Sequence, residues 1–191
     1  MARRALIAAI IFLGSSMAMA QQATAPDPYD VAEAYQVYSA LLPSEDAANS
    51  GKGTLVIQQE TLRGAEPSDP CLTPEAAAKF KDAVADYKQV NRKPWLLQRQ
   101  FQIAQPYELV SSDAIGKLFK QGAWNGFYKR YPNSGGYLTL SGVGFNHDKT
   151  RAIVYSGTAC GMLCGSWSWH LLEKINGKWK EVPGVSCLTV S

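Results

Sequence analysis

The sequence predicts an α+β fold in which N-terminal helices pack on a C-terminal antiparallel β-meander sheet. Three observations predict it. Helical spacing of apolar residues and a marked helix start occur early in the 191 residues. The last third alternates β-forming runs with turn residues, and Asn176-Gly177 is a strong hairpin signal. Helices followed by consecutive antiparallel strands are typical of one α+β domain, which we place at residues 21–191.

Two helices are expected in the first half of the chain. Apolar residues from Tyr29 to Leu42 follow helical spacing, and Pro43 is expected to end this helix. The polar stretch from Ser44 to Gly53 is expected to be flexible. Thr73-Pro74-Glu75 supplies an N-cap, a first-turn proline and a first-turn acid for a second helix that runs to about Val90.

Runs rich in β-branched and aromatic residues predict the strands. In chain order, the expected strands are Thr54–Leu62, Leu96–Ile103, Tyr107–Val110, Tyr137–Phe145, Arg151–Tyr155, Trp167–Ile175, Lys178–Val182 and Val185–Val190. A short helix over Ser112–Phe119 and an aromatic turn over Trp124–Tyr131 precede the late strands. Asn146–Thr150 and Asn176-Gly177 are expected to connect two hairpins.

The first 20 residues have the pattern of a signal peptide. Arg3 and Arg4 form a positive region, Ala5–Leu13 is apolar, and Ala18-Met19-Ala20 provides the small residues before a cut after Ala20. The apolar run is about half of the roughly 20 residues that span a bilayer. We therefore expect a periplasmic or secreted protein with no membrane anchor after cleavage.

Signal cleavage changes the charge balance. The full chain has 19 Lys and Arg against 16 Asp and Glu, and removing Arg3 and Arg4 leaves 17 against 16, or +1. A nucleic-acid-binding protein usually carries a basic stripe, so this balance argues against nucleic acid as a partner. A hydrophobic content of 46% and a charged content of 18% are typical of a globular protein.

Four cysteines are expected to form disulfides in an oxidising compartment, and three pairings are open. They are Cys71, Cys160, Cys164 and Cys187. Gly161 and Gly165 make the chain around Cys160 and Cys164 pliable enough to close a small loop, which favours that pair and leaves Cys71 with Cys187.

The C-terminal third carries a recurrent pattern. Its parts are Tyr131–Gly136, Ser141–Asn146, Ala152–Tyr155, Cys160–Gly165, Leu171–Lys174 and Asn176–Trp179. This pattern resembles a family of small exported bacterial proteins with no assigned function. The resemblance implies a single domain in which Cys160 and Cys164 are a fixed feature of the hairpin, and it implies no activity.

Several catalytic chemistries fit the sequence poorly. Ser134 lies in a turn like that of a serine-protease nucleophile, but Pro132 replaces a glycine, and His147 and His170 follow the serine rather than precede it. The three residues between Cys160 and Cys164 differ from the two of redox motifs, which argues for a structural clip. No phosphate-binding glycine loop or zinc-protease motif occurs, and we expect no cofactor and no resident metal.

The aromatic residues indicate where a partner would bind. Trp124 and Tyr131 belong to one aromatic segment, while Trp167 and Trp169 lie two apart and share one face of a strand, with His170 on the other. Buried, the two tryptophans would be core; exposed, they would form a platform for an envelope protein, a peptide or a glycan.

We therefore expect a non-enzymatic binding or interaction module that uses a disulfide-clipped, glycine-rich loop. One alternative is a hydrolase of a cell-envelope polymer, with His170 or an acid as the base. A second alternative is a soft-metal protein that binds copper through Cys160, Met162 and Cys164, with His147 or His170 added.

Overall fold

The computed structural model describes residues 25–49, 53–63, 72–183 and 187–190. The expected signal peptide, Cys71 and the side chain of Cys187 lie outside this described part. The elements are α1 (Ala32–Asn49), β1 (Leu55–Gln58), α2 (Pro74–Lys79), α3 (Lys81–Val90), β2 (Tyr107–Val110), α4 (Ser112–Lys120), α5 (Ala123–Arg130), β3 (Tyr137–Leu140), β4 (Gly144–Phe145), β5 (Arg151–Gly161), β6 (Cys164–Ile175), β7 (Lys178–Glu181) and β8 (Cys187–Val190).

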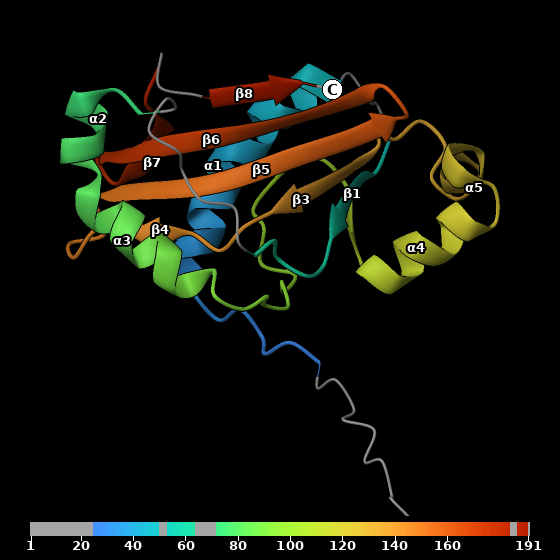
Figure 1. Cartoon of the computed structure of the whole chain (residues 1–191), viewed down its shortest axis with the longest axis horizontal. Helices are drawn as coiled ribbons and strands as arrows, with labels where there is room; N and C mark the ends of the chain where they lie inside the picture. The colour runs from blue at the N-terminus through green and yellow to red at the C-terminus, as the bar shows by residue number, and fades with distance from the viewer. Residues whose placement is uncertain (1–24, 50–52, 64–71, 184–186, 191) are drawn as a thin grey trace, which may run out of the picture.

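All of these strands belong to one sheet, which confirms the predicted α+β class (Figure 1). The strand order is β2-β1-β3-β5-β6-β7, with β4 beside β5 and β8 beside β6. Strands β3, β5, β6 and β7 form the expected antiparallel meander. Strand β1, however, pairs in parallel with both β2 and β3, so the sheet as a whole is mixed. Helices connect β1 to β2 and β2 to β3, and a helical crossover brings strands back in parallel.

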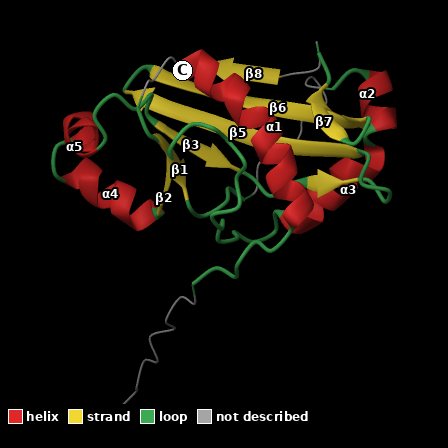
Figure 2. Cartoon of the chain, turned by 180° about the vertical axis from the view of Figure 1, so that it is seen from behind, coloured by secondary structure: helices red, strands yellow, loops and turns green. Residues whose placement is uncertain are grey.

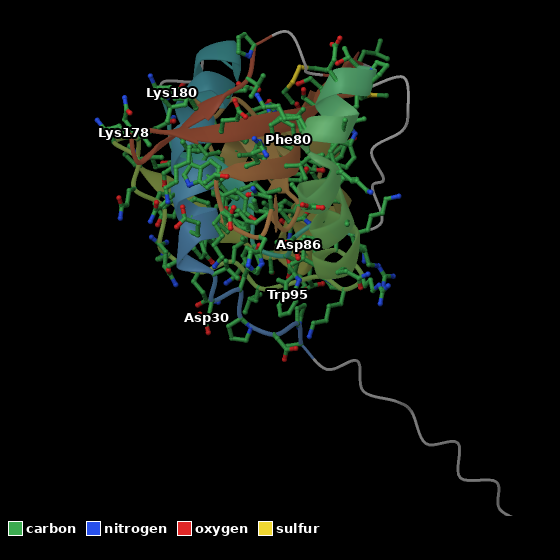
Figure 3. All side chains as sticks on the ribbon, turned by 90° about the vertical axis from the view of Figure 1, so that its left-hand side faces the viewer. Asp30, Phe80, Asp86, Trp95, Lys178 and Lys180 are labelled. Atoms are coloured by element: carbon green, nitrogen blue, oxygen red, sulfur yellow. A yellow bond between two sulfur atoms is a disulfide. The ribbon has the colours of Figure 1, made fainter. Side chains whose placement is uncertain are left out.

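Helices cover both faces of the sheet. Helix α1 crosses one face (Figure 2), where Val154 and Leu172 share a buried cluster with Tyr38. Helices α2 and α3 cover the opposite face, and Phe80 at their junction points toward the sheet, while Lys178 and Lys180 project away from it (Figure 3). Helices α4 and α5 pack on β1 and β2 through a third apolar cluster.

The C-terminal hairpin signals are confirmed. Asn176 and Gly177 have φ angles of 51° and 76°, and they join β6 to β7 in the expected two-residue turn. The turn at residues 146–150 joins β4 to β5. Strand β5 continues to Gly161, six residues beyond the expected end at Tyr155, because its partner β6 begins earlier than expected, at Cys164.

Two helix predictions need correction. Helix α1 continues through Pro43 to Asn49, so the expected stop at Pro43 and the flexible stretch from Ser44 are wrong as far as Asn49. A proline removes one intrahelical hydrogen bond, which kinks a helix without always ending it. The second helix begins at the Thr73 cap as predicted but is interrupted at Phe80, whose φ and ψ are −102° and 10°.

Two further predictions are wrong in the middle of the chain. Residues 96–103 form no strand; Leu96 makes only isolated bridges. Residues 124–131, expected as a turn, lie largely within helix α5. Trp124 and Phe127, one helical turn apart, both make ring contacts with Tyr137 of β3, which help to hold this short helix on the sheet.

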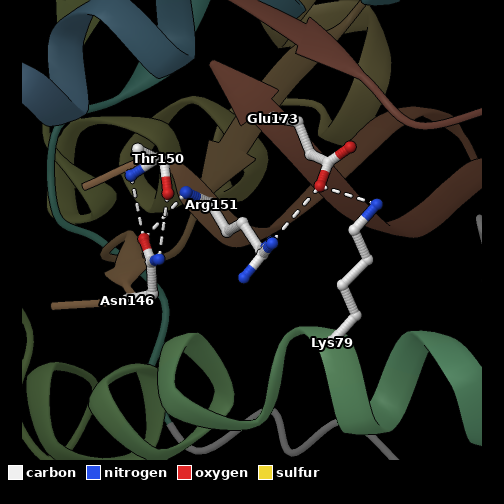
Figure 4. A network of polar contacts seen from close by, with 5 residues as sticks. All are labelled: Lys79, Asn146, Thr150, Arg151 and Glu173. Atoms are coloured by element: carbon white, nitrogen blue, oxygen red, sulfur yellow. Dashed lines mark hydrogen bonds and ion pairs between the residues drawn. The ribbon is translucent and has the colours of Figure 1, made fainter. Parts of the chain in front are cut away.

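Ion pairs link helix α2 to the sheet (Figure 4). The carboxylate of Glu173 on β6 accepts bonds from Lys79 of α2 at 2.8 Å and from Arg151 of β5 at 3.3 Å. The side chain of Asn146 closes the nearby turn by bonding Thr150 and the backbone of Arg151. All of these groups lie at the end of the β5–β6 hairpin remote from Gly161.

Candidate functional site

The distal end of the β5–β6 hairpin is closed by a disulfide. Gly161 pairs with Cys164, so Met162 and Leu163 alone form the turn. The pairing register shifts between Ala159 and Gly161, which places Cys160 as an extra residue on β5. The structure joins Cys160 to Cys164, with their Cα atoms 5.1 Å apart. We call Cys160–Cys164 the clipped tip.

The two central residues of the clipped tip are unusually exposed. Met162 is 92% exposed and Leu163 is 90% exposed. The third large exposed apolar residue of the described part is Ile175, at 47%, beside the other turn of β6. Leucine and methionine are normally among the more buried residue types, so two adjacent ones in solvent make this turn a candidate contact site.

Helix α5 and strand β3 brace the clipped tip. The Tyr128 hydroxyl donates to the backbone oxygen of Cys160 at 2.8 Å. Trp124 stacks on both Tyr128 and Tyr137, with ring centroids 5.7 and 6.0 Å apart. Gly136 has a φ of 103°, and a Cβ there would lie 2.1 Å from the backbone oxygen of Ala159. The fit between β3 and the end of β5 therefore depends on this glycine.

The two tryptophans of β6 have different environments. Trp169 is 5% exposed and makes an edge contact with Tyr87 of α3, at a centroid distance of 4.9 Å. Trp167 is half-buried, and its indole ring lies over Gly157, where a Cβ would come within 2.1 Å of the ring. The two residues share a face, as expected, but only Trp167 retains substantial exposure.

The sequence-predicted binding residues therefore divide into two groups. Trp124 and Trp167 are half-buried and remain partly accessible. Trp169, His170 and Tyr131 lie inside the fold, exposed by 5%, 6% and 5%. Burial raises the pKa of Tyr131, whose hydroxyl donates to Glu108 at 3.1 Å. Of the five predicted binding residues, only Trp124 and Trp167 are therefore accessible to a partner in the folded protein.

A second group of polar side chains lies on the α1 face of the sheet. The Ser156 oxygen lies 2.8 Å from Nε2 of His170, and Nδ1 of His170 lies 2.6 Å from a Glu181 oxygen. An ionised carboxylate only accepts, so Nδ1 carries a proton, and in a neutral imidazole Nε2 then accepts from the Ser156 hydroxyl. This order of groups is that of a serine nucleophile, a base and an orienting acid.

Sequence reasoning identified His170 but missed Ser156 and Glu181. The three residues come from three strands, and no local motif links them. The Asn176-Gly177 turn sets the β6–β7 register, so Glu181 could have been placed diagonal to His170. Ser156 could not have been placed beside His170 in this way, because the strand expected from the sequence ended at Tyr155.

The histidines of the soft-metal hypothesis are not brought near its cysteines. His147 lies before β5 and Cys160 near its end, a span of about 30 Å at roughly 3.3 Å per residue. His170 lies six residues along β6 from Cys164, about 20 Å away by the same rise. Within the described residues, no group of three or more His, Cys, Asp or Glu side chains could hold a metal ion.

Comparison of the chain with protein families, with curated proteins and with solved structures finds no match. Among the described helices, none has both the length and the apolar character required to cross a bilayer.

Proposed function

We propose that this chain is an exported, non-enzymatic binding module of the cell envelope, and that the clipped tip is its contact element. The observation that carries the proposal is the exposure of Met162 and Leu163, at 92% and 90%. Because nearly all of their apolar surface faces water, covering both side chains would contribute about 1.5–3 kcal/mol each.

The surroundings of the clipped tip favour binding further. The Cys160–Cys164 disulfide and the Tyr128 hydrogen bond limit the conformations of the turn before any partner arrives. A preorganised loop loses less conformational entropy on binding, so more of the contact energy appears as affinity. Half-buried Trp124 and Trp167 add the aromatic surface that is enriched at interaction sites.

Site-directed photo-crosslinking tests this proposal in cells that export the protein. A photoreactive phenylalanine analogue in place of Leu163 should give discrete adducts with envelope components. The same analogue in place of Ile175, which is 47% exposed at the other end of β6, should give few. Adducts should diminish in a Cys160→Ser/Cys164→Ser background. Equal crosslinking from both positions, or none from Leu163, would overturn the proposal.

The Ser156–His170–Glu181 group supports a second candidate, a hydrolase of an ester- or amide-containing envelope polymer. In that reaction the Ser156 oxygen would bond to the acyl carbon while its proton passed to His170 and then to the leaving group. Water would release the acyl group and restore the serine. Ser156 is only 1% exposed, so a substrate would first have to open the α1 face, which is why this candidate stands second.

A fluorophosphonate probe separates the two candidates. The hydrolase requires labelling of the wild type that is lost in Ser156→Ala and kept in Ser168→Ala. Ser168 lies across from Ser156 on the same face and is similarly buried, at 8% exposure. If the native protein remains unlabelled, the hydrolase candidate is rejected.

The soft-metal alternative requires free thiols at Cys160 and Cys164, and the disulfide leaves neither thiol available. Thiol titration of the purified protein, followed by disulfide mapping, tests it directly. Free thiols at Cys160 and Cys164 together with Cu(I) binding would count in its favour, and retention of the Cys160–Cys164 bridge without copper binding would exclude it.

A further inference from the structure

The outer half of the β5–β6 hairpin carries no charged side chain. From Tyr155 through Trp169 there is no Asp, Glu, Lys or Arg. The charges of these strands, such as Arg151 and Glu173, lie at the opposite end of the hairpin. The outer half can therefore leave water without the large cost of desolvating an ion.

From the clipped tip inward, exposed apolar side chains are followed by the amphipathic rings of a tyrosine and a tryptophan. Met162 and Leu163 are outermost, and their backbone neighbours Gly161 and Cys164 are already paired to each other. Directly behind them lies Tyr128, whose hydroxyl reaches the Cys160 carbonyl. Its stacking partner Trp124 is also half-buried. Apolar residues followed by tyrosine and tryptophan are the sequence of layers that a membrane interface favours.

Positive charge lies beside this end of the sheet. The segment Ser112–Arg130, which covers α4 and α5, contains four Lys and Arg residues and one acid. Lys117 pairs with Asp113 and Arg130 with Glu108 of β2, so Lys120 and Lys129 supply the unpaired positive charge of this segment among the described residues. Lys129 directly follows Tyr128, and α5 lies next to the end of the hairpin (Figure 1). Basic residues that lie just behind an apolar tip are attracted to anionic lipid head groups.

We infer that the clipped tip docks on an anionic lipid surface, with Met162 and Leu163 inserted shallowly and α5 at the head-group level. This inference rests on the proposed function and names its partner. A stable protein interface buries about 800 Å² on each side, far more than a two-residue convex turn provides. A lipid surface requires no complementary pocket, and two apolar side chains with a few basic residues give reversible association.

Vesicle sedimentation tests the inference with the chain that begins at Gln21, so that the apolar segment Ala5–Leu13 does not contribute. Vesicles of phosphatidylcholine alone are compared with vesicles containing one third phosphatidylglycerol. The wild type should bind the anionic vesicles more tightly, and added salt should weaken that binding. Met162→Ser/Leu163→Ser should weaken it by about tenfold or more.

Two matched variants make the test specific. Ile175→Ser removes an exposed apolar residue remote from the clipped tip and should leave vesicle binding unchanged. Lys120→Gln/Lys129→Gln should weaken binding to anionic vesicles and leave binding to neutral vesicles unchanged. All of these side chains are exposed, so thermal unfolding of the variants should match the wild type and exclude a folding defect.

The results also separate this inference from the proposed function. Absent vesicle binding, or equal loss with Ile175→Ser, would overturn the lipid inference. If Leu163 nevertheless crosslinks to a protein in cells, the proposed function stands with a protein partner. If Leu163 crosslinks to nothing and vesicles do not bind, both are wrong.

Discussion

Ser156 and His170 lie diagonally across neighbouring strands, with the serine oxygen 2.8 Å from Nε2 of the imidazole. Val154 pairs with His170 and Ser156 with Ser168, so the two side chains meet on the face that α1 covers. Ser156 and His170 are 1% and 6% exposed. A buried polar pair of this kind is costly unless its hydrogen bonds are made, so the contact contributes to holding β5 and β6 in register.

Ser156→Ala should lower the free energy of unfolding by about 1–2 kcal/mol, because it removes a buried hydrogen bond to the imidazole. Urea unfolding followed by circular dichroism measures the change. Ser168→Ala is the control: no side-chain hydrogen bond of Ser168 is found in the described part of the chain, and its effect should stay within about 0.5 kcal/mol. Equal effects of the two substitutions would contradict the assigned role of the contact.

Local signals predicted local structure well in this chain. The Asn176-Gly177 turn follows from two positive φ angles that asparagine and glycine tolerate. The Thr73 cap follows from a side chain that accepts the Ala76 amide at 3.2 Å. The Cys160–Cys164 bridge could be favoured in advance because Gly161 and Gly165 make the chain around the two cysteines pliable enough to close a small loop.

Features set by distant contacts were not predictable in the same way. The parallel pairing of β1 with β2 depends on how two helices cross the sheet, which no short motif encodes. The continuation of α1 through Pro43 to Asn49 was not predictable from the proline itself, because one lost intrahelical hydrogen bond can kink a helix without ending it. The contact between Ser156 and His170 requires the register of β5 and β6, and that register includes a shift next to Cys160.

Stability should fall at acidic pH partly through Glu33. Its carboxylate accepts from Lys174 at 2.7 Å and from the Trp179 indole at 2.6 Å. Burial raises the pKa of Glu33, but these bonds outweigh burial and leave the pKa below its usual value. A lowered folded pKa means that this contribution is present above about pH 4.3 and is lost as the pH falls through the folded value.

Glu33→Gln should therefore destabilise the protein at neutral pH and have a smaller effect below the folded pKa. Urea midpoints measured between neutral and acidic pH give the comparison. Glu173→Gln should likewise destabilise the protein more at neutral than at acidic pH. Bonds from Lys79 and Arg151 lower the pKa of the Glu173 carboxyl, although burial acts to raise it. A pH-independent loss in both variants would show that packing, not ionisation, is responsible.

Removing the clip should have mainly local effects. Cys160→Ser/Cys164→Ser opens a loop of only a few residues, for which chain entropy predicts a loss of about 2 kcal/mol. Far-ultraviolet circular dichroism should change little, while amide hydrogen exchange at residues 160–165 should accelerate. The Tyr128 bond to the Cys160 carbonyl remains available, so Tyr128→Phe in the same background should accelerate exchange further. Unchanged exchange and proteolysis at the tip would argue that the disulfide does not rigidify it.

Two glycine-to-alanine substitutions should act in opposite directions. Gly116 lies inside α4, and a Cβ there meets no atom within 4 Å. Gly116→Ala should stabilise the protein by about 0.5–1 kcal/mol, because alanine loses less backbone freedom on forming a helix. Gly136 differs in both respects, since its φ is 103° and its Cβ would lie 2.1 Å from the Ala159 carbonyl oxygen.

Gly136→Ala should therefore destabilise the protein by about 2 kcal/mol or more, through backbone strain and displacement of β3 from β5. Because Tyr137 pairs with Ala159 directly beside the clip, the same substitution should loosen the support of the tip. Thermal unfolding measures the two stabilities, and Leu163 crosslinking or vesicle binding measures the tip. A stable Gly136→Ala protein with full binding would mean that β3 can shift without moving Cys160. Weakened binding by Gly136→Ala but not by Gly116→Ala would instead tie binding to the bracing of the tip by β3.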